Sequence, residues 1–350
     1  GIDSLNPSSF SEVVGTSASA TAADVDRAVA AARRAFADWS RTSAEERAAI
    51  LRGAAKTMRE RRDFFAAVMV YEAGKPWREA DADIEEAIDF LEYYSREAIR
   101  LSGEHRLQPY LLGEHNDLVY HPLGVVGVIG PWNFPCAIVT GMSSASLAAG
   151  NTVVLKPAEQ TPVIAKLYVQ ALESAGLPSG VINFLPGRGE VAGQRLVEHP
   201  DVNMIVFTGS RGVGLHIVRE ASVVREGQSF VKRTVPEMGG KNRIIVDESA
   251  DLDSALPDIL YSAFGFSGQK CSACSRLIVL ENLYDECLER LRDGVESLKV
   301  GAADHPATQV GPVIDQEAVD KIMSYVDYGK KNANLIISRD VEELAGKGYF

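Results

Sequence analysis

The sequence predicts an α/β protein in which a doubly wound, Rossmann-like parallel sheet follows an N-terminal helical part and precedes the beginning of a second α/β domain. Helix caps dominate the first part of the chain, whereas short β-branched runs alternate with helix-length segments from Gly124 onward. Strands separated by helices in this way form a mostly parallel sheet with helices on both faces. A length of 350 residues suits about two domains, and we expect their boundary near Gly239 and Gly240.

Two helix starts are marked by capping boxes, in which a hydroxyl residue precedes an acid by three positions. Thr21 pairs with Asp24, and Ser43 pairs with Glu46. Apolar residues with helical spacing follow each cap. These patterns predict two amphipathic helices early in the chain.

The rest of the first part also has helical patterns until a change near residue 106. One helix is expected to end near Gly74, and a long helix should cover residues 77–101. Residues 106–112 and 117–121 have strand patterns on either side of a turn, which predicts a hairpin over residues 106–121. The helical part is therefore expected to cover residues 1–105.

The predicted sheet strands are short runs rich in β-branched and other apolar residues. They are residues 125–129, 152–155, 181–184, 204–207, 231–235 and 244–246. Ligands of doubly wound sheets bind at the carboxyl ends of the strands. The loops after these runs are therefore where we expect the chemistry.

Composition excludes several other classes of protein. The chain has 36 Lys and Arg against 48 Asp and Glu, a net charge of −12, so it has no basic excess for binding nucleic acid. Four cysteines are too few for a disulfide scaffold and favour a reducing compartment. Residues 118–155 contain no Asp, Glu, Lys or Arg, but their prolines and glycines argue against a membrane span and favour buried strands and a loop. No targeting segment is visible, so we expect a cytoplasmic protein, or a mitochondrial matrix protein in a eukaryote.

The loop at residues 265–276 contains two of the cysteines, Cys271 and Cys274. Cys271 lies on a Gly-bearing loop beside Lys270, where a thiol could have a depressed pKa and act as a nucleophile. A CxxC redox pair or half of a zinc site is disfavoured, because no second CxxC and no close His pair is present. A buried structural thiol is the plainer alternative, and the loop alone favours it.

Asn133 lies between two prolines in the segment at residues 130–135. A side-chain amide fixed between rigid turns can donate to a developing oxyanion. An Asx-type turn is an equally good interpretation of this segment alone.

A strand end, a Gly-bearing turn and a helix start follow one another at residues 207–214, around Gly209 and Ser210. Free backbone N–H groups at a helix start bind phosphate. Such turns are also common for steric reasons, and this one lacks the G-x-G-x-x-G fingerprint. The turn at Gly187 and Gly189 is a weaker signal of the same kind.

Two carboxylates also follow predicted strands. Lys156 and Glu159 could hold a ribose diol between them, and Glu159 would repel a 2′-phosphate, although a solvated surface pair is the usual explanation. Glu237 precedes two glycines and could be a general base in a cleft, or an exposed residue before a turn.

Taken together and in this order, the five loops resemble the aldehyde dehydrogenase superfamily, and the resemblance covers essentially the whole chain. The matching motifs are P-W-N-F-P at residues 131–135, K-P-x-E at 156–159, F-T-G-S at 207–210, E-M-G-G-K at 237–241 and G-Q-K-C at 268–271. Within the superfamily, residues 207–214 and 266–276 are most similar to the 1-pyrroline-5-carboxylate dehydrogenase branch. That branch oxidises glutamate semialdehyde to glutamate in proline catabolism.

The resemblance implies an NAD-dependent oxidation of an aldehyde through a cysteine thioester, without a metal. Cys271 would be the nucleophile, Asn133 and the Cys271 backbone N–H would form the oxyanion hole, and Glu237 would activate the hydrolytic water. Lys156 and Glu159 would take the adenine ribose of NAD, Trp132 and Ser210 the pyrophosphate, and Gly209 would allow close approach. The other residues expected to contact the cofactor are Ile129, Pro131, Gly189, Met238 and Gly239.

The resemblance also implies a domain plan. Residues 122–238 would bind NAD, residues 239–350 would begin the catalytic domain, and the hairpin would be of the type used in oligomerisation. The family's sequence continues past Phe350, so we expect a truncated member whose complete form is a homo-oligomer. The expected partner is a small aldehyde substrate, with no nucleic acid and no membrane.

Overall fold

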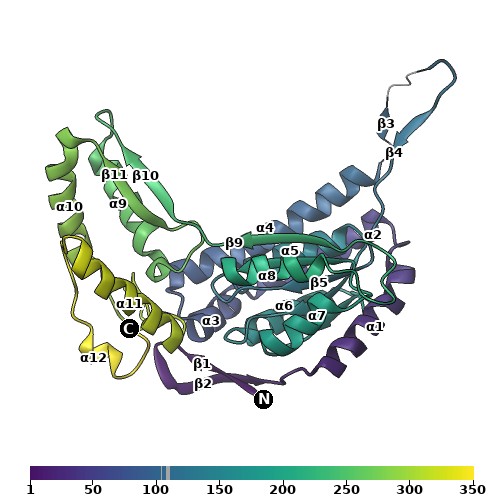
Figure 1. The fold of residues 1–350 in the computed structure, drawn as a ribbon, viewed down its shortest axis with the longest axis horizontal. Helices are drawn as coiled ribbons and strands as arrows, with labels where there is room; N and C mark the ends of the chain where they lie inside the picture. The colour runs from purple at the N-terminus through teal and green to yellow at the C-terminus, as the bar shows by residue number, and fades with distance from the viewer. Residues whose placement is uncertain (104, 108–110) are drawn as a thin grey trace. The chain divides into compact units, whose positions relative to one another are not determined.

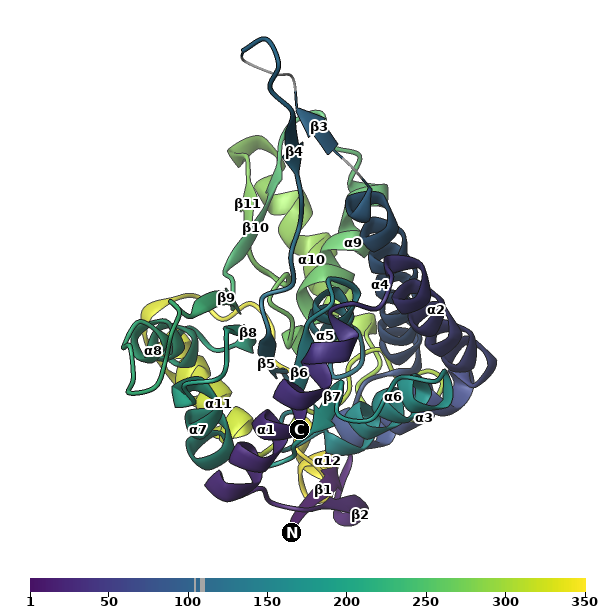
Figure 2. The same cartoon turned by 90° about the vertical axis from the view of Figure 1, so that its right-hand side faces the viewer.

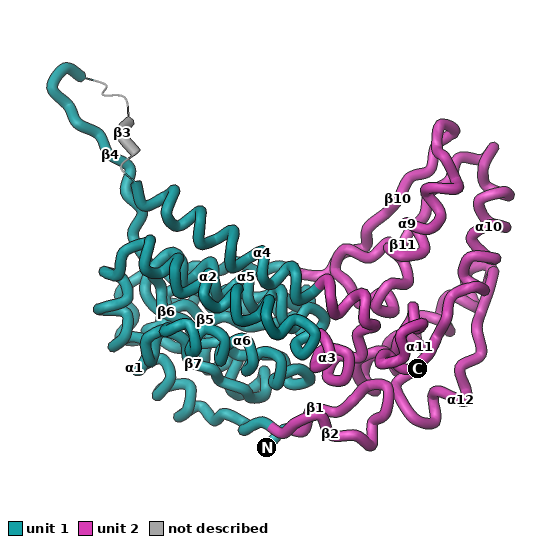
Figure 3. Tube along the Cα trace, turned by 180° about the vertical axis from the view of Figure 1, so that it is seen from behind, with its two compact units in different colours: residues 1–2, 17–65, 83–237 teal, residues 3–16, 66–82, 238–350 magenta. Residues whose placement is uncertain are grey.

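The computed structural model describes residues 1–103, 105–107 and 111–350 (Figure 1, Figure 2). Its contacts divide the chain into two compact units, and neither unit is a single stretch of sequence (Figure 3). Unit 1 consists of residues 1–2, 17–65 and 83–237, and unit 2 consists of residues 3–16, 66–82 and 238–350. The residues expected to form one helical part, 1–105, are therefore shared between the two units.

The early helices follow the sequence patterns closely. They are α1 (Ala22–Trp39), α2 (Ala44–Glu60), α3 (Arg62–Ala73) and α4 (Trp77–Ser102). Both predicted capping boxes are confirmed, because Thr21 and Ser43 each accept the backbone N–H of the acid three residues on and donate their own to its carboxylate. The expected helix end near Gly74 and the long helix over residues 77–101 are also confirmed.

The chain begins with two strands that the sequence patterns did not predict. They are β1 (Ile2–Asn6) and β2 (Ser9–Ser17), which form a two-stranded sheet. Between them the Ser8 N–H donates to Asn6 Oδ1 over 2.9 Å. The prediction of a wholly helical first part was wrong here, because β2 is mostly exposed and polar and has little of the alternation by which half-buried strands are recognised.

The hairpin predicted over residues 106–121 is present in shorter form. Strand β3 (His105–Leu107) pairs antiparallel with β4 (Asn116–Leu118), with His105 opposite Leu118. Residues 108–110, part of the first predicted run, lie outside the described residues. The role of the hairpin in oligomerisation stays a prediction.

Within the described residues, unit 1 is built on a five-stranded sheet of order β7-β6-β5-β8-β9. Its strands are β5 (Val125–Ile129), β6 (Thr152–Lys156), β7 (Ile182–Phe184), β8 (Met204–Gly209) and β9 (Arg233–Met238). The pairs β5–β6, β5–β8 and β6–β7 are parallel. This order reverses direction at β5, which confirms the doubly wound plan.

One predicted strand is displaced along the sequence. The run at residues 231–235 becomes β9, which begins at Arg233 and ends at Met238. Pairing starts only where the Arg233 N–H donates to Asn203 O over 3.0 Å, and Val231 before it is 80% exposed. β-branched residues alone therefore misplaced the start of this strand by two positions.

Helices cover both faces of the sheet, as Figure 2 shows for α1 and α7 on one side and α6 with α2 on the other. The remaining helices of unit 1 are α5 (Ala137–Ala148), α6 (Pro162–Ser174), η1 (Gly189–Gly193), α7 (Gln194–Glu198) and α8 (Arg211–Ala221). Helix α5 lies inside residues 118–155, so that stretch is not only strands and a loop as expected. None of the helices in the described part of the chain is long and apolar enough to cross a membrane.

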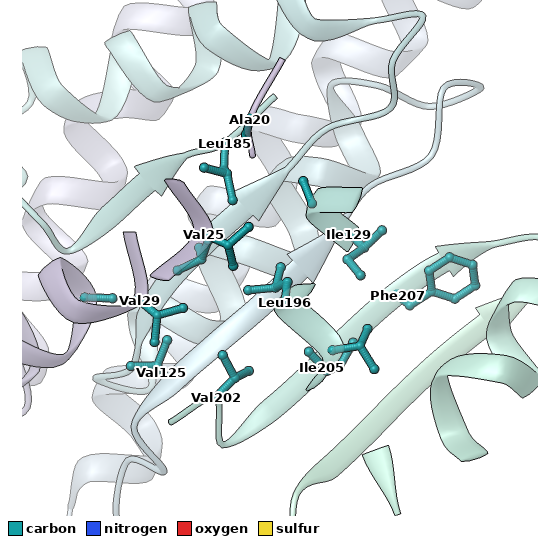
Figure 4. Packing of buried hydrophobic residues seen from close by; sticks show 14 of the residues in the cluster. Ala20, Val25, Val29, Val125, Ile129, Leu185, Leu196, Val202, Ile205 and Phe207 are labelled. Carbon is teal, nitrogen blue, oxygen red and sulfur yellow. The ribbon is translucent and has the colours of Figure 1, made fainter. Parts of the chain in front are cut away.

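The core of unit 1 forms where α1 and α7 pack on the sheet (Figure 4). Val25 and Val29 of α1 meet Leu196 of α7 and Ile205 of β8, and all four side chains are fully buried. Burying such a side chain stabilises the fold by about 1.5–3 kcal/mol. This packing holds the strand ends, and with them the loops, in fixed positions.

Unit 2 contains the beginning of a second α/β arrangement. Strand β10 (Asn242–Val246) runs parallel to β11 (Cys274–Val279). The other elements of its C-terminal segment, residues 238–350, are α9 (Leu252–Phe264), η2 (Gly265–Gly268), η3 (Glu281–Leu283), α10 (Tyr284–Ser297), α11 (Gln316–Asn332) and α12 (Glu342–Ala345). Val246, Leu252, Leu256, Ile259 and Cys287 form a small buried core between them.

Candidate active site

Strands β5 and β6 end level with each other and β8 ends two residues further on, which brings several of the predicted residues to one edge of the sheet. Ile129 of β5 lies opposite Lys156 of β6 on one side and Phe207 of β8 on the other. The loops that follow hold Trp132 and Asn133 after β5, and Ser210 after β8. The switch point between β5 and β8 is where ligands of doubly wound sheets bind. Ile129 itself packs in the core, so only its backbone is left to meet a ligand (Figure 4).

The loop that carries Asn133 is fixed at its far end by a residue that the sequence analysis missed. Helix α5 begins after Cys136, whose side chain makes no capping hydrogen bond. Instead, the carboxylate of Asp83, fully buried in α4, accepts the Ala137 N–H over 2.6 Å. Asp83 is more than fifty positions away in sequence, so no local pattern could have indicated it. Asn133 itself is half-buried, and Pro131 before it is buried.

Lys156, Glu159 and Gly189 come together at the end of β6. The Lys156 side chain is 3% exposed, and its Nζ donates to Glu159 Oε1 over 3.1 Å and to Pro157 O over 2.9 Å. Burial lowers the pKa of Lys156, and the Glu159 carboxylate partly opposes that shift. The Gly189 N–H also donates to Glu159 Oε1, over 2.6 Å. The pair is therefore not a solvated surface pair, because its lysine is buried and its carboxylate has a second donor.

The turn after β8 has an open helix start. Ser210 is the N-cap of α8, and its hydroxyl accepts the Val213 N–H over 3.3 Å. A Cβ added at Gly212 would meet nothing within 4 Å, so the first turn faces open space. Gly209 has a steric role of its own, because a Cβ there would lie 2.5 Å from Cζ of Phe207. The packing of Phe207 alone requires this glycine.

Glu237 lies on β9 at the end of unit 1. Its side chain is exposed, and the following residues, Met238 and Gly239, already belong to unit 2. Strand β9 is at the edge of the sheet, where Pro236 is tolerated because its missing N–H would face away from β8.

Cys271 lies in unit 2, on a loop between η2 and β11 that side chains from elsewhere hold in place. The Asn242 amide donates to Cys271 O over 2.7 Å and to Ala273 O over 3.3 Å. A Cβ at Gly240 would lie only 2.6 Å from Cys271 O, so the close approach requires glycine there. Upstream, Phe266 has a φ of 50°, a left-handed conformation that non-glycine residues rarely adopt. Sequence reasoning missed Asn242, although it directly follows the E-M-G-G-K motif.

Lys270, the neighbour of Cys271, has a different partner from the one expected. Its Nζ lies 2.7 Å from Glu79 Oε2, and the two side chains are 11% and 5% exposed. The same ammonium lies 4.6 Å from the ring centroid of Tyr261. The lysine expected to favour a Cys271 thiolate is thus engaged in a buried ion pair, which fixes the loop instead.

The second cysteine of the loop differs from the first. Cys271 is half-buried, whereas Cys274 is buried at the start of β11 and its thiol donates to Arg276 O over 3.4 Å. All four cysteines of the chain are free thiols. Across the described residues, no cluster of three or more His, Cys, Asp or Glu could hold a metal ion.

The residues of unit 1 suit a dinucleotide. Two donors converge on one oxygen of Glu159, and within the described residues Oε2 makes no hydrogen bond, so an acceptor remains for a ribose hydroxyl. The open first turn of α8 offers backbone N–H groups to a phosphate. The donor and acceptor set therefore fits the adenosine and pyrophosphate parts of such a cofactor.

Comparisons with known proteins agree with this assignment. Residues 1–350 match the aldehyde dehydrogenase family. A 1-pyrroline-5-carboxylate dehydrogenase of Geobacillus kaustophilus (strain HTA426) is 50% identical over 349 residues, which are 100% of this chain and 67% of that protein. These matches confirm the resemblance that the order of the five motifs indicated.

Two solved structures are also similar. A 1-pyrroline-5-carboxylate dehydrogenase from Thermus with bound NAD is 46% identical, with a TM-score of 0.94 over 100% of this chain and 67% of that one. Proline utilization A from Bdellovibrio bacteriovorus is 47% identical, with a TM-score of 0.93 over 96% of this chain and 35% of that one. The chain thus spans about two thirds of the length of the single-function relatives.

Proposed function

Because this chain belongs to the aldehyde dehydrogenase family, we propose that it serves the NAD-dependent oxidation of an aldehyde to a carboxylic acid, with Cys271 as the nucleophile. The observation that carries the proposal is the loop of Cys271: a half-buried thiol on a segment that Asn242 and the Lys270–Glu79 pair hold in place. The proposed substrate is L-glutamate 5-semialdehyde, the open form of 1-pyrroline-5-carboxylate, because relatives that are 46–50% identical to this chain are named 1-pyrroline-5-carboxylate dehydrogenase. A cytoplasmic location and assembly into a homo-oligomer remain predictions.

The cofactor would be held mainly by unit 1. Lys156 and Glu159 would bind the adenine ribose, and Ser210 and Trp132 the pyrophosphate. NAD, when bound, supplies an acceptor for the hydride that leaves the substrate carbon. The residues proposed to line the rest of the cofactor site are Ile129, Pro131, Gly209, Met238 and Gly239.

The side chains divide the chemistry among them. Sγ of Cys271, as the thiolate, bonds to the aldehyde carbon, and the carbonyl oxygen becomes the oxyanion of a thiohemiacetal. Asn133 Nδ2 and the Cys271 backbone N–H would donate to that oxyanion. Loss of hydride converts the thiohemiacetal to a thioester. Glu237 would then take a proton from a water molecule while the water oxygen bonds to the acyl carbon. The carbon–sulfur bond breaks, which releases the acid and the Cys271 thiolate.

The test is the formation of NADH with a panel of aldehydes that includes glutamate semialdehyde. Turnover should be highest with glutamate semialdehyde and should disappear in Cys271→Ala. Turnover only with other aldehydes would support the proposed reaction and contradict the proposed substrate. Binding of NAD without turnover of any aldehyde would leave a catalytically silent nucleotide-binding chain and would overturn the proposal.

A further inference from the structure

We propose that the backbone N–H of Gly189 locks the carboxylate of Glu159 in one orientation, and that this lock sets the preference of the site for NAD over NADP. The inference deepens the proposed function and rests on it. It gives Gly189 a role different from the cofactor contact expected from the sequence, because its N–H is already used within the protein.

The geometry of the lock involves only unit 1. Glu159 Oε1 accepts two hydrogen bonds, from Gly189 N over 2.6 Å and from Lys156 Nζ over 3.1 Å. Because both donors meet the same oxygen, the carboxylate cannot rotate without losing them. Within the described residues the second oxygen makes no hydrogen bond, so it stays available to a ligand.

Both donors are themselves fixed. Lys156 is buried, and its Nζ also donates to Pro157 O. Gly189 is the first residue of η1, and the N–H groups of Val191 and Ala192 are bonded to Arg188 O behind it. A Cβ at Gly193 would lie 3.6 Å from Cδ of Lys156, so η1 also packs on the stem of the lysine. The lock thus joins the end of β6 to the start of η1.

A carboxylate held in one orientation discriminates between NAD and NADP better than a carboxylate that is free to rotate. The 2′-phosphate of NADP carries a charge of about −1.5 to −2 near neutral pH. A carboxylate that is free to rotate can turn away from that charge, which relieves most of the repulsion. Glu159 held by two donors cannot do so, and it also presents its oxygen to the 2′-hydroxyl of NAD without a cost in side-chain entropy.

The backbone at Gly189 allows a sharp test. Arg188 has φ −68° and ψ 142°, a conformation that residues before proline favour. Proline is tolerated at the first position of a helix, so Gly189→Pro should fold. The substitution removes the N–H and puts the ring Cδ where the hydrogen pointed at Glu159, so the carboxylate must move. Gly189→Ala is the matched control, because it keeps the N–H and its Cβ would meet Glu159 Oε1 at an ordinary 3.7 Å.

The experiment measures dissociation constants for NAD and NADP by calorimetric titration of the whole chain. The ratio of the dissociation constant for NADP to that for NAD should be the same in wild type and Gly189→Ala. In Gly189→Pro this ratio should fall about tenfold, as expected for the loss of a hydrogen bond to a charged group. Glu159→Gln should narrow it at least as much. An unchanged ratio in Gly189→Pro, together with a narrowed ratio in Glu159→Gln, overturns the lock and leaves the proposed function intact. No dinucleotide binding by wild type, or equal binding of both, would contradict the proposed function itself.

A second measurement does not depend on the proline variant folding. Amide hydrogen exchange at Gly189, followed by NMR in the absence of cofactor, should be slow in wild type and at least about tenfold faster in Glu159→Ala. Equal exchange rates in the two proteins would show that the Gly189 N–H does not bind the carboxylate, and would overturn the lock whatever the cofactor titrations show.

Discussion

The candidate loops of unit 1 and the loop of the proposed nucleophile, Cys271, in unit 2 (called the nucleophile loop) are positioned in different ways. In unit 1 the candidate residues follow strands that end at the same edge of one sheet, so the register of β5, β6 and β8 places them. In unit 2 a pair of strands supports the loop of Cys271, and side chains from distant segments fix it: Asn242, and Glu79 through Lys270. Many backbone hydrogen bonds of the sheet position the loops of unit 1, whereas a few side chains position the loop of Cys271. Single substitutions should therefore disturb the nucleophile loop more than the cofactor loops.

The strands of the two units also differ in how much of their side chains is exposed. Every residue of β5 and β6 is buried, as expected for central strands of a covered parallel sheet. In contrast, Ile245 of β10 is 68% exposed and Ile278 of β11 is 46% exposed. Two strands alone are marginally stable, so the backbone of unit 2 contributes less rigidity to its loop.

The largest expected effect is on the thiol. Cys271→Ala should reduce NADH formation from an aldehyde to background, because it removes the thiol proposed to form the thioester and the other thiol of the loop, Cys274, is buried. Cys274→Ala should keep most of the activity, since Cys274 is buried at the start of β11 and donates to Arg276 O. The measurement is the steady-state rate of NADH formation by each variant, with circular dichroism as the control for folding. Equal loss in both folded variants would favour a dithiol mechanism.

The next effect tests Glu237 of unit 1, which is proposed to act late in the reaction. Glu237→Gln should lower the steady-state rate by about 10²–10⁴-fold, the usual contribution of a general base. The first turnover should still give a burst of NADH, because hydride transfer precedes the attack of water. Stopped-flow absorbance would reveal the burst. A variant that binds NAD but shows no burst would assign Glu237 to an earlier step.

A third experiment compares a buried ion pair with an exposed one. Glu79→Gln leaves the Lys270 ammonium buried without its partner, which should lower the free energy of unfolding of unit 2 by about 3–5 kcal/mol. Glu60→Gln removes an exposed pair with Lys56 and should cost less than about 1 kcal/mol. Urea denaturation measures both. Similar small losses in the two variants would mean that the Lys270–Glu79 pair does not hold the nucleophile loop.

The smallest effect concerns a side chain that supports β9 in unit 1. Burial lowers the pKa of Lys232 to about 8, while its Nζ donates to Val197 O and His199 O. An unfolded lysine has a pKa of about 10.4, so between these values the unfolded chain binds more protons and wild type gains stability as pH rises. Relative to Lys232→Met, the gain should be about 3 kcal/mol over that range, since each unit of pKa shift corresponds to about 1.4 kcal/mol. Thermal unfolding at several pH values measures it, and a difference that shrinks with rising pH would contradict the assignment.

The contrast between the units also separates what could be predicted from what could not. Local patterns predicted the caps at Thr21 and Ser43, because capping depends on neighbours in sequence. They also predicted the strands that precede Asn133 and Ser210, for the same reason. Strand β2 was missed because its residues are mostly exposed and polar, and β1 was missed because its two buried residues, Ser4 and Asn6, are polar.

The sequence by itself determined the doubly wound plan, the order of the five loops and the identity of the candidate residues, because the motifs are contiguous and each needs only its own strand and turn. Only the tertiary structure decided which distant groups serve them: Asp83 at the start of α5, Glu79 on Lys270, and the Gly189 N–H on Glu159. It also showed that Lys156 is buried and that Phe207 requires Gly209. Burial and hydrogen-bond pairing depend on segments that are far apart in the chain, and no local pattern records which of them will meet.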